Sequence, residues 1–189
     1  GMSTEEEIDR LINYLDNKKC TYYLLHCHSA YPAPNHHLNL QYIKNLIHKT
    51  NSHVGYSSHD IGMQASVIAY SQGARIFEKH ITLDKKGYGN DNHVSIEPTD
   101  FKNYINSLKI SSQMLTNFLG DKRIISPGEK ANRISLAKSA FVKKDYSKGD
   151  SINIHDLEFY PSGEGINMWD IVNEVKKPLR RNIKRNSIL

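Results

Sequence analysis

Helical and strand-like patterns of hydrophobic residues alternate along the first two thirds of the chain. The first pattern follows Ser3 and Thr4, either of which can cap a helix, and its apolar residues recur at three- and four-residue spacing: Ile8, Leu11, Ile12 and Leu15. The next segment, Thr21–Cys27, is short, rich in aromatic residues and nearly all apolar, which is typical of a strand buried on both faces of a parallel sheet. The chain is therefore predicted to begin with a helix and a buried strand.

The same alternation continues to residue 120. Further strands are predicted over His53–His59 and Ala74–Thr82. Further helices are predicted over Asn39–Lys49, over the residues leading to Gly73, and from a cap at Thr99 to Gly120. The last helix is expected to bury a stripe made of Phe101, Ile105, Leu108, Leu115 and Phe118. Regular alternation of helices and strands indicates an α/β fold with parallel strands, and three strands are too few to form a closed barrel or a wide sheet.

The pattern changes after residue 120. Residues 121–132 are polar and contain the turn formers Ser126, Pro127 and Gly128, so we expect a linker there. Beyond it, Ile134–Val142 is strand-like, and a helical pattern returns only over Met168–Val175. We therefore divide the chain into an α/β part (1–120), a linker (121–132) and a small, mainly β domain (133–189).

Charge and histidine are distributed unevenly between these parts. Of the net charge of +5, all is carried by residues 121–189, whereas nine of the ten histidines precede residue 120. The basic segment Lys176–Arg185 contains no aromatic residues and is interrupted by Pro178, so we do not expect it to bind nucleic acid. The histidine-rich α/β part is the better candidate for chemistry.

Several kinds of protein are disfavoured by the sequence. Cys20 and Cys27 do not have the spacing of a zinc ribbon or a disulfide framework. No apolar stretch approaches the roughly 18 residues that cross a bilayer, and the acidic start does not resemble a signal peptide. We therefore expect a cytoplasmic protein that does not associate with membranes.

Histidines stand where the predicted strands end. In parallel α/β proteins, functional residues lie at the carboxyl ends of the strands, and here these ends carry His26, His28, His59 and His80. His59 and His80, on neighbouring strands, could present two imidazoles to a divalent cation and leave positions open for substrate and water. The alternative is that both rings only form hydrogen bonds with nearby backbone.

Two further segments are candidates for substrate binding. Ser57 and Ser58, at a junction from strand to helix, are suited to bind a phosphate through hydroxyl and backbone N–H groups. The glycine-rich segment Lys85–Ser95 contains Asp91 and His93 and is either a mobile substrate loop or a solvated turn. Composition does not decide between these two interpretations.

The order of several short motifs resembles that of the sialic acid synthases. HCHSAYPAP is similar to the end of the sixth barrel strand in this family, VGYSSHDIG to the seventh, FEKHITLD to the eighth, and GNDNHVSIEPTDF to the substrate loop and the following helix. SLAKSAFVKKDYSKGD, FYPSGEGI and MWDIV resemble the antifreeze-like (SAF) domain that follows the barrel. The resemblance extends over nearly the whole chain.

The resemblance implies a fold and an activity. The fold would be the C-terminal half of a TIM (β/α)8 barrel followed by the small SAF domain. The activity would be condensation of phosphoenolpyruvate with an N-acylated hexosamine, such as N-acetylmannosamine, to give a nonulosonic acid and phosphate. Enzymes of the family form homodimers in which each SAF domain caps the barrel of the other subunit.

The resemblance also implies residue roles. His59 and His80 would hold a divalent metal, Mn²⁺ or alternatively Mg²⁺ or Co²⁺. Ser57 would contact the phosphate of phosphoenolpyruvate, Ser29 stands where many members have Asn or Ser, and Tyr31 and Asp91 would face the sugar. Together, His59, His80 and Asp91 are the expected catalytic residues.

The sequence departs from the family pattern in three places. Ser58 stands where the family usually has Asp, and Tyr160 where bacterial members often have Arg. The first four or five strands, with the lysines expected to bind phosphoenolpyruvate, are not in this sequence. Gly1-Met2 is either a tag-derived start or the end of the fifth strand.

Two other functions therefore remain open: a non-catalytic fragment that binds sugar or protein, and a metal-dependent barrel hydrolase.

A half barrel exposes the edge and the interior of its strands, which predicts self-association or a missing partner chain. We expect the isolated chain to sediment as oligomers or to have low solubility. Sedimentation velocity combined with thermal melting tests this prediction, and a monodisperse monomer that melts cooperatively would contradict it.

Overall fold

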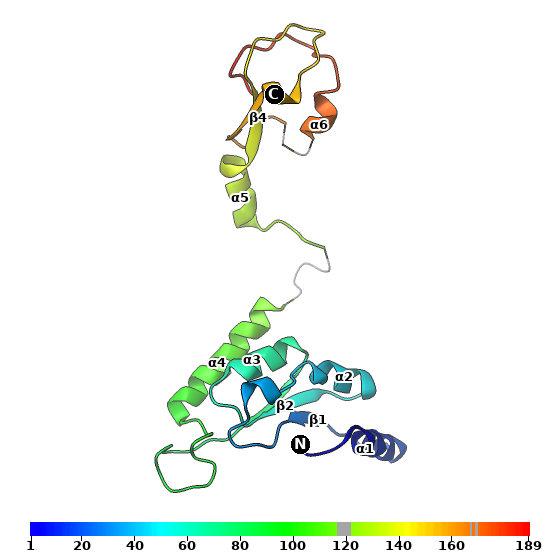
Figure 1. Ribbon diagram of the computed structural model, residues 1–189, viewed down its shortest axis with the longest axis vertical. Helices are drawn as coiled ribbons and strands as arrows, with labels where there is room; N and C mark the ends of the chain where they lie inside the picture. The colour runs from blue at the N-terminus through cyan, green and yellow to red at the C-terminus, as the bar shows by residue number, and fades with distance from the viewer. Residues whose placement is uncertain (117–121, 167, 169) are drawn as a thin grey trace. The chain divides into compact units, whose positions relative to one another are not determined.

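The computed structural model describes residues 1–116, 122–166, 168 and 170–189, which form two compact units, Gly1–Phe118 and Leu119–Leu189 (Figure 1). Each unit has a hydrophobic core of its own. Within the described ranges, no helix has the length and apolar character that a bilayer span requires.

The first unit is an α/β layer in which helices and strands alternate. Its sheet consists of β1 (Leu24–Cys27), β2 (Val54–Ser58) and β3 (Ile76–Lys79), which are parallel and lie side by side in this order. The helices are α1 (Glu5–Asn17), α2 (Tyr42–Lys49), α3 (Gln64–Ser71) and α4 (Pro98–Met114), with a 3-10 turn at Asn35–His37. The parallel α/β order predicted from the sequence is thus confirmed.

The strand register gives the sheet two different faces. Tyr56 lies opposite Phe77, and Ser57 lies opposite both Cys27 and Glu78. Because side chains alternate along a strand, the face that carries Val54, Tyr56 and Phe77 packs against the helices, while Ser57 and Glu78 lie on the other face. The helix-covered face contains the core of this unit: Ala33, Leu38, Ile43, Leu46, Val54, Tyr56, Ala65, Ala69 and Ala74.

The other face is only partly covered. The apolar run of β1 favours a strand buried on both faces, but its residues are half-buried, and Glu78 of β3 is exposed. Both β1 and β3 are edge strands in the described sheet, each paired only with β2.

Helix ends follow local capping chemistry, which explains one correct and one wrong prediction. Thr4 caps α1 and forms a capping box with Glu7, as its position predicts. The cap expected at Thr99 is wrong: Glu97 is the cap residue of α4 and Pro98 begins the helix, where its fixed φ and missing N–H are tolerated.

The stripe predicted for α4 is also partly wrong. Tyr104 is the buried residue of this helix, and its hydroxyl donates a hydrogen bond to Ser66 of α3 at 3.1 Å, whereas Ile105 and Leu115 are exposed. The helix packs on α3, where Tyr104 meets Ser66. Phe118 and Gly120 lie outside the described residues.

The second unit is small and built around an antiparallel hairpin. Its elements are α5 (Pro127–Leu136), β4 (Lys138–Val142), a 3-10 turn (Ile154–Asp156), β5 (Leu157–Pro161) and α6 (Ile171–Glu174), and β4 pairs with β5. Single bridges add Ile183 beside Tyr146 and Ile188 beside Phe141. The core of this unit consists of Ala140, Val142, Tyr146, Ile152, Leu157, Ile171 and Ile183.

Two predictions for the second unit are corrected. The linker expected over 121–132 and the strand expected over Ile134–Val142 are both interrupted by α5. Ser126 and Glu129 form a capping box around Pro127, so residues interpreted as a turn are a helix start. The helix predicted over Met168–Val175 is reduced to Ile171–Glu174; residues 167 and 169 lie outside the described ranges.

Gly55 allows β2 and β3 to lie close together. A Cβ atom at this position would lie 2.5 Å from the carbonyl oxygen of Ile76 and 2.9 Å from its Cβ, so a side chain there would force the two strands apart. Both strands continue directly into His59 and His80, so their spacing also sets the spacing of these rings.

Replacing Gly55 with Ala should lower the free energy of unfolding of the first unit by about 1–3 kcal/mol, as is typical of overpacked sites. Gly128→Ala is the matched control, because a Cβ at Gly128 meets no atom within 4 Å. We expect the control to leave stability unchanged or to raise it by up to about 1 kcal/mol. Urea unfolding measures both effects, and equal stability of the two variants would contradict the close approach.

Candidate functional site

Two histidine rings meet at the carboxyl ends of β2 and β3. His59 and His80 follow these strands directly, and their ring centroids are 5.1 Å apart with the planes at 67°. His59 is buried, while the side chain of His80 is about one third exposed. Because the strands are parallel and adjacent, they bring together two residues that are 21 positions apart in the sequence.

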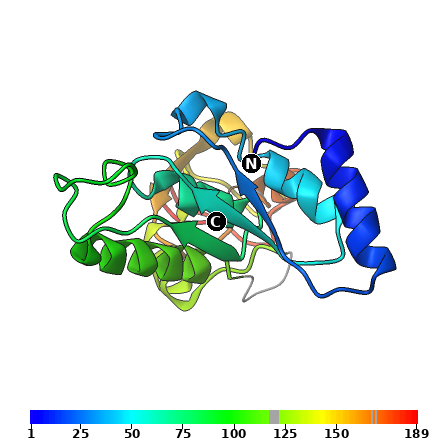
Figure 2. The same ribbon diagram turned by 90° about the horizontal axis from the view of Figure 1, so that it is seen from below.

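An aromatic ring and a carboxylate lie beside this pair. The centroid of the Tyr31 ring is 4.2 Å from that of His59 and 5.9 Å from that of His80. Asp91, in the loop after β3, places Oδ2 3.7 Å from Nδ1 of His80. Figure 2 shows that loop (green) at the end of the sheet toward which the strands point. Both Tyr31 and Asp91 are partly exposed, so the cluster is open to solvent.

Backbone contacts fix the orientation of His59. Its Nδ1 lies 3.0 Å from the carbonyl oxygen of His28, and its own carbonyl oxygen accepts a hydrogen bond of 3.0 Å from the N–H of Ala33. A carbonyl oxygen only accepts, so Nδ1 carries the proton and the Nε2 lone pair remains available. The backbone contact and a ligand role, considered as alternatives from the sequence, are thus compatible.

The geometry of the pair fits a shared divalent ion. Metal–nitrogen bonds of about 2.1 Å place the centroids of two ligating rings roughly 5 Å apart when the angle at the metal is near 100°. A ring held through Nδ1 by a backbone carbonyl is the usual arrangement of a metal-binding histidine. Among the described residues, no group of three or more His, Cys, Asp and Glu side chains is placed to hold a metal.

The two candidate serines lie further from the rings. Ser57 is half-buried in β2 on the same sheet face as His59, two positions earlier. Ser29 places Oγ 3.6 Å from Sγ of Cys27, and this sulfur lies 3.7 Å from Nδ1 of His59. His93, in the same loop as Asp91, is within hydrogen-bond distance of the backbone oxygen of Tyr31, at 3.2 Å from Nε2.

A buried polar network lies on the opposite, helix-covered face and was not predicted. The hydroxyls of Tyr56 and Ser58 each donate to Oδ1 of Asp60 at 2.7 Å. Lys79 Nζ donates to Ser58 Oγ at 2.8 Å and also to the backbone oxygen of Asp60. The sequence held a signal for it: the alternate residues Tyr56, Ser58 and Asp60 put polar groups on a face predicted to be buried, where such groups need partners.

Burial changes the ionisation of two members of this network. It raises the pKa of Tyr56 far above its ordinary value, with the hydrogen bond to Asp60 as the second cause, so the phenol remains protonated and donates. Burial also lowers the pKa of Lys79, and the negative charge of Asp60 opposes this effect.

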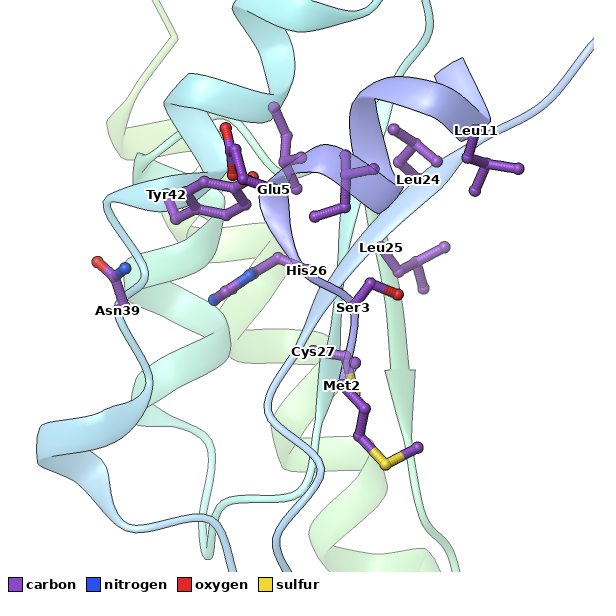
Figure 3. A pocket seen from close by; sticks show the side chains of 13 residues that line it. Met2, Ser3, Glu5, Leu11, Leu24, Leu25, His26, Cys27, Asn39 and Tyr42 are labelled. Atoms are coloured by element: carbon purple, nitrogen blue, oxygen red, sulfur yellow. The ribbon is translucent and has the colours of Figure 1, made fainter. Parts of the chain in front are cut away.

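A separate cleft of about 340 Å³ lies along the outer edge of β1. Figure 3 shows that its walls come from the N-terminal segment, α1, β1 and the start of α2, with Leu11, Leu24 and Leu25 at one end and His26 and Tyr42 at the other. Burial lowers the pKa of His26, whose Nε2 lies 2.7 Å from the carbonyl oxygen of Leu38. His26 therefore lines this cleft and is not part of the His59–His80 cluster.

Comparison with known proteins places the first unit in a family. Residues 1–119 match the model of the NeuB family. Over 183 residues the chain is 33% identical to the N,N'-diacetyllegionaminic acid synthase of Legionella pneumophila, covering 96% of this chain and 51% of that enzyme.

Solved structures agree with this match. The N-acetylneuraminic acid synthetase of Leptospira borgpetersenii superposes with a TM-score of 0.63 at 29% identity, over 70% of this chain and 47% of that one. A putative spore coat polysaccharide biosynthesis protein E of Chromobacterium violaceum gives a TM-score of 0.68 at 25% identity, over 100% of this chain and 57% of that one. The chain thus spans about half the length of the proteins that it matches.

The parallel α/β fold and these similarities relate the chain to a group of proteins that includes sugar-acid synthases. The chain belongs to the NeuB family.

The contacts of two histidines predict opposite neutral tautomers. His59 should be protonated at Nδ1, which faces the His28 carbonyl, and His26 at Nε2, which faces the Leu38 carbonyl. Long-range ¹⁵N–¹H correlation spectra at about pH 8 distinguish the two forms. A spectrum in which His59 carries its proton on Nε2 would rule out the orientation described for a metal ligand.

Proposed function

We propose that the first unit forms the C-terminal half of a (β/α)8 barrel and carries part of a synthase site that condenses phosphoenolpyruvate with an N-acylated hexosamine. Water would add to the former enol carbon after the new C–C bond forms, and phosphate would leave to give a nonulosonic acid. The observation that carries this proposal is the meeting of His59 and His80, 5.1 Å apart between centroids, at neighbouring strand ends of a NeuB family chain. Tyr31 and Asp91 border the same cluster.

Each residue then has a distinct role in the proposed site. His59 and His80 would hold a divalent metal, with Mn²⁺ as the first candidate and Mg²⁺ or Co²⁺ as alternatives. When bound, such an ion polarises the aldehyde of the open-chain sugar and so favours attack by the enol carbon of phosphoenolpyruvate. Tyr31 would pack against the sugar, and Asp91, 3.7 Å from the His80 ring, would accept a hydrogen bond from a sugar hydroxyl.

Phosphate recognition is assigned to Ser57 and supported by its position. Its side chain lies on the same face of the sheet as His59, so a phosphoenolpyruvate molecule whose phosphate meets Ser57 would have its enol carbon near the rings. Ser29, at the end of the neighbouring strand, would border the same region. The charge that balances the phosphate is expected from the half of the matched relative that this sequence does not span.

The open edge of β1 supports the proposed completion of a barrel. In the described sheet β1 has one neighbour, and the cleft along its other side is lined by Leu11, Leu24 and Leu25. An edge of this kind is covered when a further strand pairs with it. The same proposal makes the second unit the SAF domain and the complete enzyme a homodimer in which this domain caps the barrel of the other subunit.

Metal binding tests the proposed site in the chain as it stands. Mn²⁺ affinity, measured by electron paramagnetic resonance, should fall at least about tenfold in His59→Ala and in His80→Ala. His53→Ala is the matched control, because His53 precedes β2 and stacks on Tyr23 at the other end of the sheet. If all three variants bind Mn²⁺ like the unchanged chain, the assignment of the two ligands is wrong.

Catalysis is tested by joining the chain to the N-terminal part of the Legionella pneumophila relative. Phosphate release from phosphoenolpyruvate should require both Mn²⁺ and an N-acylhexosamine, and should be lost in the His59→Ala variant of the same chimera. Hydrolysis that proceeds without phosphoenolpyruvate would favour a barrel hydrolase. A folded chimera that binds sugar without releasing phosphate would favour a non-catalytic binding protein.

A further inference from the structure

The buried network around Asp60 joins the two strand ends that carry the histidines. Asp60 directly follows His59, and Lys79 directly precedes His80. Lys79 donates to both Ser58 Oγ and the Asp60 backbone oxygen, so its side chain reaches from β3 to the end of β2. A shift of either strand end would break these hydrogen bonds.

The side chains of this network bond to one another. Oδ1 of Asp60 accepts from Tyr56 and Ser58, and the Ser58 hydroxyl in turn accepts from Lys79. Asp60 and Tyr56 are each only 1% exposed. In such surroundings these hydrogen bonds favour one geometry, because breaking one leaves a buried polar group without a partner.

The network also accounts for an unusual residue in the sequence. Ser58 stands where the sialic acid synthases usually have Asp, and its hydroxyl lies 2.7 Å from the Asp60 carboxylate. The carboxylate in contact with Ser58 thus belongs to a residue two positions further along the chain. Ser58 is the last residue of β2 and Asp60 follows two positions later, with its carboxylate in contact with the Ser58 hydroxyl, so a carboxylate at either position can reach the same partners.

We propose that Asp60 is the positioning residue of the site: it replaces the carboxylate expected at position 58 and, through Ser58 and Lys79, holds His59 and His80 at the spacing that a shared cation requires. The cation belongs to the function proposed above, whereas the spacing of the rings is a property of the network itself. Asp60 faces away from the rings and acts on them through the backbone of β2 and β3.

The charge of the network is tested with Asp60→Asn, which keeps the size of the side chain and an accepting oxygen. We expect Mn²⁺ affinity to fall about tenfold, the range found when groups behind metal ligands are replaced. Asp100→Asn on α4, a partly exposed carboxylate paired with Lys85, is the matched control and should bind Mn²⁺ like the unchanged chain. Equal binding by all three proteins overturns the proposal.

A carboxylate exchange tests the replacement directly. Asp60→Ser alone should bind Mn²⁺ weakly, whereas the double variant Ser58→Asp/Asp60→Ser should regain affinity to within about threefold of the unchanged chain. A merely structural role for Asp60 predicts no such rescue. If the double variant folds, as judged by circular dichroism, and binds as weakly as Asp60→Ser, the proposal is wrong.

A readout without metal separates this inference from the proposed function. Nuclear Overhauser contacts between the rings of His59 and His80 should be present in the unchanged chain and in Asp100→Asn, and weakened in Asp60→Asn. If the unchanged chain shows these contacts and binds no Mn²⁺, the metal site fails while the positioning role stands. If the contacts are the same in Asp60→Asn, the positioning role fails whatever the metal result.

Discussion

The site depends on the register of three parallel strands. Ser57 pairs with Cys27 on one side and with Glu78 on the other, so the three strands end side by side and their following residues gather at one edge. Gly55 makes this register possible between β2 and β3, because any side chain there would collide with Ile76. Successive side chains alternate between the two faces, so the histidine cluster lies on one face and the Asp60 network on the other. Each histidine is therefore adjacent in sequence to a member of the network: His59 to Asp60, and His80 to Lys79.

Much of the first unit could be predicted from the sequence, because its signals are local and periodic. The capping box at Thr4, the apolar runs and the glycine after α3 each specify a few neighbouring residues, and the structure has helices and strands at these places. The proximity of His59 and His80 also followed, since adjacent parallel strands bring their ends together. Local patterns did not reveal that β1 would be an edge strand, because its burial depends on what pairs with it.

The remaining errors come from signals with two meanings. Ser126, Pro127 and Glu129 are typical both of a turn and of a helix start, and only the hydrogen bonds of the capping box decide for α5. The unpredicted Asp60 network has a related cause: a serine at the end of a strand is typical both of a phosphate site and of a buried hydroxyl that needs a partner. In the structure Ser58 contacts Asp60 and Lys79.

The segment between β1 and α2 is linked to His59 at three points. The His28 carbonyl holds the ring, the Ala33 amide holds the backbone of the same residue, and Tyr31, between them, lies against the ring. Under the proposed function, one short stretch of chain both meets the sugar and aims the imidazole. Under that function, a change in this stretch that alters the contact with the sugar would also alter the orientation of the imidazole, so the two properties would be coupled.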